Sequence, residues 1–274
     1  MRSRLAMLLR GIGVAGVLAL TACAGVQTTQ SGAIGINRTQ YMSSMVPESQ
    51  LRQEAETQYE QVIAQARTQG KLDRNASQVK RVQAITNKLV AQAGIFRPEA
   101  VNWPWEVHVI SSDEVNAWCM PGGKIAVYTG LLDKIKPTDA ELAAVLGHEI
   151  AHALREHARE RVSQQMVTNV GLTILAAVTG SKATADLGSS LTSVMFTLPN
   201  SREHETEADR MGVELAARAG YDPRAAVTLW QKMAQAGGGG QPEFLSTHPS
   251  PASRSADLQQ AAAQVMPLYD AVKR

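Results

Sequence analysis

Two histidines and a glutamate stand at a spacing that suits metal-assisted hydrolysis, in the run His148-Glu149-Ile-Ala-His152. The surrounding residues are mainly Ala, Leu and Glu, with apolar side chains at helical spacing and no proline after Pro137. Residues four apart on a helix share a face, so His148 and His152 point the same way. Two such imidazoles suit a tetrahedral zinc ion, and Glu149 can act as general base on a water molecule there. The alternative is a helix with two unrelated histidines, which the helical context disfavours.

A third ligand is expected, because a catalytic zinc ion normally has three protein ligands and one open position. The helix predicted over residues 201–217 offers acidic side chains, and Glu205 and Asp209 border its apolar face. An acidic group on an inward face needs a partner, so Glu205 is predicted as the third ligand and Asp209 as the acceptor that orients a zinc-bound histidine. Other charged residues of this helix are expected on its solvated side: Glu203, Glu207, Arg210 and Glu214.

The zinc-binding helix is predicted to start at Thr138, whose side chain can form a capping box with Glu141. After His152 the sequence is dense in charge as far as Arg161, and this run is expected to continue the helix into solvent. His157 lies five residues beyond His152, off the zinc-facing side of the helix, and is not predicted as a ligand.

A small sheet is expected beside this helix. Alternating apolar and polar residues predict strands at 105–110 and 124–128. A short strand near Asn116 would form the sheet edge, where an extended protein substrate can add through backbone hydrogen bonds. Helices are predicted over about 48–68 and 76–93, so the fold class is α+β and mostly helical, with the small β-sheet beside the active-site helix.

Residues 166–198 consist of two apolar runs rich in small residues, with a polar break near Ser181. The first run is short for a membrane span, so a tightly packed helical hairpin is predicted. The alternative is a lid or a membrane-facing element over the site, and a hairpin can also serve as a lid.

The chain begins with basic residues and an apolar run that ends in Leu20-Thr-Ala-Cys23, which predicts a signal peptide over residues 1–22. This ending resembles a bacterial lipobox, which implies lipidation of Cys23 and attachment to a membrane without spanning it. The alternative is a plain signal peptide, or an uncleaved anchor, with an incidental cysteine. Because Ala24 follows the cysteine, the resemblance to lipoprotein sorting in Gram-negative bacteria implies a periplasmic location at the outer membrane.

Residues 23–47, rich in Gln, Thr, Ser and Gly, are expected to be a flexible tether, followed by one catalytic domain over residues 48–274. Removal of residues 1–22 takes away three arginines and no acid, which moves the formal net charge from +2 to −1. The mature chain therefore gives no indication of a nucleic-acid partner. With Cys23 lipidated, Cys119 is the one remaining thiol, so no intramolecular disulfide is expected.

The motif HEIAH at 148–152, followed by SREHETEAD at 201–209, resembles the gluzincin metallopeptidases of the CAAX-protease and HtpX type. The resemblance covers about residues 48–260. It implies a zincin-type domain with one Zn²⁺ per chain and zinc-dependent endopeptidase activity on protein substrates. The lipobox and the absence of long apolar spans resemble the periplasmic lipoprotein members most closely. This further resemblance implies quality control of misfolded or misassembled cell-envelope proteins.

The same resemblance gives a role to His248, which precedes Pro249. In similar proteins a histidine of this kind can reach the zinc as a fourth ligand in a closed state. A fourth protein ligand would silence the enzyme by displacing water, and a glycine joint at 237–240 would let the loop move. Arg254 is expected either to hold this loop or to contact substrate. Both His248 and Arg254 are candidates for stabilising the oxyanion.

A function of another class stays open from the sequence: a zinc-stabilised periplasmic chaperone or outer-membrane assembly factor with little turnover. A purely structural zinc site is usually closed by four protein ligands. Three ligands together with Glu149 therefore favour the enzyme.

Overall fold

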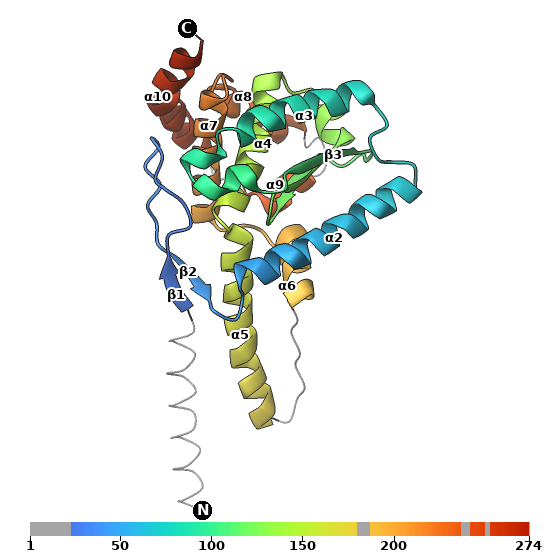
Figure 1. Ribbon diagram of the computed structural model, residues 1–274, viewed down its shortest axis with the longest axis vertical. Helices are drawn as coiled ribbons and strands as arrows, with labels where there is room; N and C mark the ends of the chain where they lie inside the picture. Colours follow the sequence, from blue (N-terminus) through green and yellow to red (C-terminus); the bar gives the residue numbers. More distant parts are fainter. Residues whose placement is uncertain (1–22, 180–186, 237–241, 250–252, 274) are drawn as a thin grey trace, which may run out of the picture.

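The helix that carries both histidines, α4 (Asp139–Leu154), lies at the centre of the fold (Figure 1). It begins with the predicted capping box between Thr138 and Glu141 and is buried from Glu141 to its last residue. The structure is a computed structural model and describes residues 23–179, 187–236, 242–249 and 253–273.

Helices and one strand bury α4 from several sides. These elements are α3 (Ala76–Val90), α7 (Arg202–Arg218), α8 (Ala225–Ala236) and β4 (Ala117–Met120). Helix α10 (Arg254–Val272) packs in turn on α7 and α8. In the contact between α4 and α7, Gly147 lies against Gly212. The absence of side chains at both positions lets the histidine helix and the acidic helix approach closely.

The predicted sheet is present and has three strands. In the order β3-β5-β4, β3 (Glu106–Ile110) and β5 (Lys124–Tyr128) run parallel, and β4 is antiparallel to β5. The short strand expected near Asn116 is β4, which forms one edge of this sheet and packs against α4. Helix α2 (Glu48–Thr68) packs on β4 and β5.

Further short helical elements connect these parts. They are the 3₁₀ helices η1 (Ala93–Ile95) and η2 (Pro98–Asn102), the π-helical turn η3 (Leu131–Ile135) and helix α9 (Glu243–Thr247). The α+β, mostly helical fold class predicted from the sequence is confirmed.

The predicted helical hairpin consists of α5 (His157–Thr179) and α6 (Leu187–Phe196), which pack on each other. Figure 1 shows α5 extending away from the body of the protein, with α6 beside it. The polar break near Ser181 lies outside the described residues. In the part of the chain that the structure describes, no helix combines the length and hydropathy needed to cross a membrane.

The expectation of a flexible tether at 23–47 is wrong. Strands β1 (Cys23–Val26) and β2 (Gln40–Ser43) pair in an antiparallel ribbon, and β2 lies against α5. Ile34, Ile36 and Met42 are buried in this segment. These apolar residues are few and unevenly spaced, so the composition indicated a linker although burial orders the segment. The predicted signal peptide, residues 1–22, lies outside the described residues.

The zinc-binding helix does not continue through Arg161 as expected. α4 ends at Leu154, and Glu156 adopts a left-handed backbone conformation with φ of 54° before α5 begins at His157. This sharp break redirects the chain. As a result, His157 lies against His152 rather than in solvent.

Candidate metal centre

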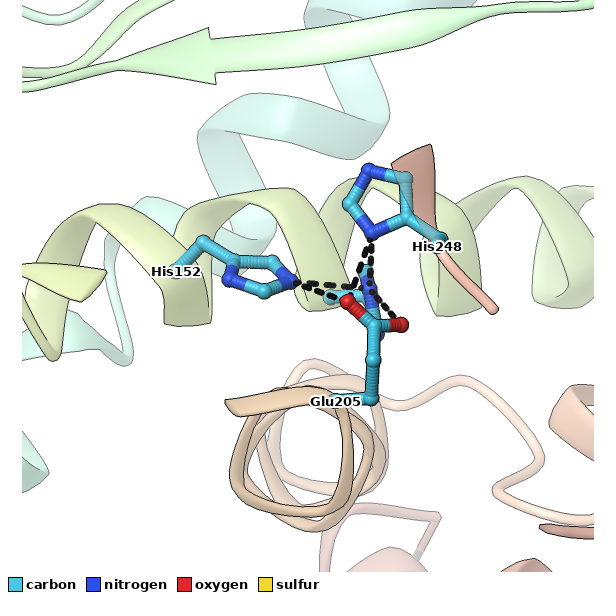
Figure 2. Close-up of side chains that lie close together, drawn as sticks. His152, Glu205 and His248 are labelled. Atoms are coloured by element: carbon cyan, nitrogen blue, oxygen red, sulfur yellow. Dashed lines mark hydrogen bonds and ion pairs between the residues drawn. The ribbon is translucent and has the colours of Figure 1, made fainter. Parts of the chain in front are cut away.

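Four side chains from three elements meet at one buried point: His148 and His152 of α4, Glu205 of α7, and His248 directly after α9. Figure 2 shows His152, Glu205 and His248 converging from separate segments. One potential ligand atom from each of the four lies within 4.8 Å of the others. Nε2 of His148 is 3.0 Å from Nε2 of His152 and 3.1 Å from Nδ1 of His248. The distance between Nδ1 of His248 and Oε1 of Glu205 is 3.0 Å.

The second ring nitrogen of each α4 histidine already has a partner. Nδ1 of His148 lies 3.0 Å from Oδ1 of Asp209, and a carboxylate can only accept, so His148 donates from Nδ1. Nδ1 of His152 lies 2.8 Å from Nδ1 of His157. Burial lowers the pKa of His157 to about 3, and this histidine is therefore neutral. Its Nε2 hydrogen is donated to Glu207, so Nδ1 of His157 accepts from His152.

Hydrogens on Nδ1 leave Nε2 of both α4 histidines available to bind a metal ion. With their hydrogens on Nδ1, His148 and His152 direct two Nε2 lone pairs at each other across 3.0 Å. Such a contact is repulsive unless a cation or proton lies between the lone pairs. The burial of Glu205 in the same group adds an anionic ligand. Three imidazoles and one carboxylate are a donor set that zinc accepts, so the residues fit the ion.

Electrostatics around the group agree with this assignment. Burial alone lowers the pKa of His148, but Glu205 and Asp209 outweigh it and raise that pKa to about 9. Burial alone would raise the pKa of Glu205, but His248 and His148 outweigh it and hold that pKa well below its usual range. Positive charge is therefore strongly favoured at the point where the ring nitrogens and Glu205 meet.

Glu149 lies beside the group and faces a cavity of about 260 Å³ between α4 and the edge strand β4. The lining includes Asn116, Trp118, His152 and His248. Oε1 of Glu149 has no hydrogen-bond partner within the described part of the chain. Burial raises the pKa of Glu149, as expected for a carboxyl group that is to exchange a proton.

Arg254 does not occupy the position expected of a substrate or oxyanion contact. It lies 3.1 Å from Oε2 of Glu205 and 2.7 Å from Oδ1 of Asp209, and it stacks on Trp230. Its side chain is buried behind these acids and is absent from the lining of the cavity. The other sequence alternative, a loop contact, is present, since Arg254 also donates to the carbonyl of Pro249.

Buried charged residues on α7 behind the metal group were not predicted from the sequence. Glu207 and Glu214, expected in solvent, are 6% and 0% exposed. The prediction assumed one buried face on α7. The N-terminal segment, residues 23–47, covers a second face through Arg38 and the backbone of Ala33. The one sequence signal that could have indicated this is the density of acids in SREHETEAD, which exceeds what one solvated face needs.

The fold and site together define a metallopeptidase: a helix with HEIAH, a neighbouring helix with a buried glutamate, and a sheet edge along a cavity. Comparison with known families agrees, since residues 76–262 match Peptidase family M48. The chain belongs to this family, whose members are zinc metallopeptidases.

Similar proteins come from two settings. The mitochondrial metalloendopeptidase OMA1 of Arabidopsis thaliana is 44% identical over 157 residues, which cover 57% of this chain and 31% of that protein. OMA1 of Bos taurus is 39% identical, with 61% and 34% covered. The beta-barrel assembly-enhancing protease of Escherichia coli is 30% identical, with 68% and 39% covered. The chain thus matches about a third to a half of the length of such relatives.

These relatives correct two expectations. A periplasmic location at the outer membrane is contradicted, because OMA1 proteins of plant, animal and yeast mitochondria match the chain. The expected special likeness to periplasmic lipoprotein members is not supported either, since mitochondrial OMA1 proteins match the chain as well as a bacterial beta-barrel assembly-enhancing protease does.

Proposed function

We propose that the chain is a zinc-dependent endopeptidase in which His148, His152 and Glu205 hold Zn²⁺ and Glu149 carries the proton. The observation that supports this most directly is the convergence of the four ligand atoms beside a carboxyl group that lines a cavity. Asp209 orients His148 by accepting its Nδ1 hydrogen. His157 accepts the Nδ1 hydrogen of His152 in the same way. Both rings are therefore held with Nε2 toward the metal.

Zinc bound in this group supplies a Lewis acid for the carbonyl of the scissile peptide bond. Glu149 takes a proton from the attacking water and delivers it to the leaving amine, and its raised pKa suits both transfers. The edge of β4 positions an extended protein substrate along the cavity by strand addition. Both histidines of α4 and Glu149 are buried, so charges at this point interact in a medium of low dielectric constant.

His248 is proposed as a fourth ligand that closes the site at rest. Its Nδ1 lies among the potential ligand atoms, and its Nε2 lies 3.5 Å from Oε1 of Glu149. In this position the ring occupies the place that an attacking water needs. The glycine joint at 237–240, expected to allow opening, lies outside the described residues.

For the substrates, we propose misfolded or misassembled proteins of the cell envelope. One support is the name of the beta-barrel assembly-enhancing proteases among the relatives. Lipidation of Cys23 remains a prediction. The cysteine is half-buried at the start of β1, and no disulfide links it to Cys119.

One observation favours the alternative, a zinc-stabilised chaperone or assembly factor. A group closed by four protein ligands, His248 included, is typical of structural zinc sites. The two functions differ in the role of Glu149, which a structural site does not require.

Digestion of unfolded casein by the full chain, with and without a chelator, separates the two functions. We expect cleavage that the chelator stops and zinc restores. The Glu149→Gln variant should bind zinc as the wild type does and lose at least about 100-fold in cleavage rate. Undiminished cleavage by this variant would refute the mechanism, and zinc binding without any cleavage by wild type would support the chaperone.

A further inference from the structure

A line of buried side chains connects the N-terminal segment to the back of His152. We propose that His157, Glu207 and Arg38 are positioning residues that fix the ring of His152 toward the metal, so that the N-terminal segment forms part of the metal site. This inference rests on the proposed function, in which His152 is a ligand.

The first link is the contact between two histidines of successive helices. Nδ1 of His152 donates to Nδ1 of His157 at 2.8 Å, and the two ring centroids lie 4.8 Å apart. His157 is 1% exposed, and its ring stacks on His204 with an interplanar angle of 20°. Packing therefore fixes the ring of His157, and its hydrogen bond fixes the tautomer of His152 with the Nε2 lone pair toward the metal.

The second link is Glu207, whose Oε2 accepts from Nε2 of His157 at 3.0 Å. Arg155, which is 0% exposed, donates to both carboxylate oxygens of Glu207 at 3.2 and 2.9 Å. These two bonds from Arg155 hold the carboxylate of Glu207 in place behind His157.

The third link comes from the N-terminal segment. Nε and Nη2 of Arg38 donate to Glu207 at 3.1 and 2.9 Å, while Nη1 and Nη2 donate to Glu160 at 2.8 Å each. One guanidinium thus joins two buried acids of different helices, which a single ammonium could not do with the same geometry. Gln40 adds bonds to Glu160 and to the carbonyl of Arg155.

Arg38 precedes the residues that match the family, which begin at residue 76. A truncation at the family boundary would therefore leave Glu160 and Glu207 buried without their shared cation. Two buried acids that lose their shared cation repel each other, and they are expected to shift. Such a shift moves His157, and with it the ring of His152.

An alternative explanation is that the segment only adds stability. The chain offers a control for it in Glu214 of α7, which holds the same segment by accepting from the backbone N–H groups of Ala33 and Ile34. None of the hydrogen bonds of Glu214 reaches the described links behind His152. A Glu214→Gln variant therefore weakens the segment without touching them.

The test measures zinc affinity of the full chain by competition with a chromogenic chelator, together with the melting temperature of the zinc-free protein. We expect the zinc dissociation constant to rise about 10–100-fold in Arg38→Met and in Glu207→Gln. Arg38→Lys should recover part of the affinity, because it keeps the charge without the planar fork. Glu214→Gln should lower the melting temperature and leave zinc affinity within about twofold of wild type.

The variants distinguish a positioning role from a purely stabilising one. Zinc affinity unchanged in Arg38→Met and Glu207→Gln, or reduced equally in Glu214→Gln, overturns the positioning role. If Arg38→Met does not fold, Arg38→Lys provides the same comparison at a smaller expected rise, and wild-type affinity in that variant likewise overturns the role. A wild-type chain that binds no zinc overturns the proposed function and the positioning role together, whereas a difference confined to Glu214→Gln overturns the positioning role alone.

Discussion

Gly147 of α4 and Gly212 of α7 touch backbone to backbone. A Cβ atom added at Gly212 would lie 2.7 Å from the backbone nitrogen of His148 and 2.8 Å from the carbonyl carbon of Gly147. Both distances are shorter than a carbon atom can tolerate, and the neighbouring atoms are backbone that cannot rotate away. The spacing between the histidines of α4 and the acids of α7 therefore depends on two missing side chains.

Gly212→Ala is expected to push α7 from α4 and to separate Glu205 from the two histidines. The added methyl should lower the free energy of unfolding by about 1–3 kcal/mol, even though alanine favours the helix. Zinc affinity should fall as well, because the ligand atoms no longer meet. Urea unfolding and chelator competition measure the two effects. A Gly212→Ala protein with wild-type zinc affinity would contradict the importance of this contact.

Removal of zinc is expected to destabilise the protein. A ligand that binds only the folded chain contributes about 2.7 kcal/mol at 100 times its dissociation constant. Calorimetry with and without chelator should therefore show a drop in melting temperature of roughly 5–10 °C for a domain of this size. Restoration by zinc, and not by magnesium, serves as the control, since a histidine-rich donor set favours zinc. An unchanged melting temperature would contradict a metal site in this group.

The sequence was sufficient to predict the parts of the site that lie on regular elements. The spacing of His148 and His152 and the apolar face of the 201–217 helix led to the residues that meet in the structure. Strands β3 and β5 were predicted because alternation of apolar and polar residues is a local signal. In each case the spacing of residues within one helix or strand was enough to predict the feature.

Residues whose position depends on a turn between helices or on contacts between distant segments were mispredicted. His157 reaches His152 only because Glu156 turns the chain at positive φ, which its sequence does not indicate. Glu207 is buried because Arg38, 169 positions earlier, neutralises it. The density of charged residues was interpreted as a sign of solvent exposure. In the structure, several of these charged residues are buried and paired with opposite charges.

Arg254 is expected to act on catalysis through Glu205 and Asp209 rather than through substrate. Arg254→Met would leave both acids buried beside an uncharged chain, with an expected loss of about 3–5 kcal/mol in stability. Zinc affinity and kcat should fall, while KM stays near its wild-type value. The exposed pair of Arg224 with Asp222 provides the control, since Arg224→Met should leave stability close to that of the wild type. A rise in KM alone would instead indicate a substrate contact.

His248→Ala is expected to open the fourth position. Proteolysis should increase, because the ring no longer occupies the space beside Glu149. X-ray absorption at the zinc edge should show one histidine fewer around the metal in the resting protein. The matched control is His108→Ala, which removes a histidine paired with Asp73 and Glu106 away from the metal group. Unchanged proteolysis together with unchanged coordination would show that His248 is not a switch.

The pairing of Glu160 with Arg38 predicts a pH dependence of stability. Burial alone would raise the pKa of Glu160, but hydrogen bonds from Arg38, His204 and Gln40 outweigh it and keep the pKa well below its usual value of 4.5. A carboxyl group with a lowered folded-state pKa contributes stability above its unfolded pKa and loses it as pH falls. The free energy of unfolding of zinc-free protein should therefore decrease from about pH 5 to about pH 3, and less steeply in Arg38→Met. Urea titrations across this range measure both slopes, and equal slopes would contradict the pairing.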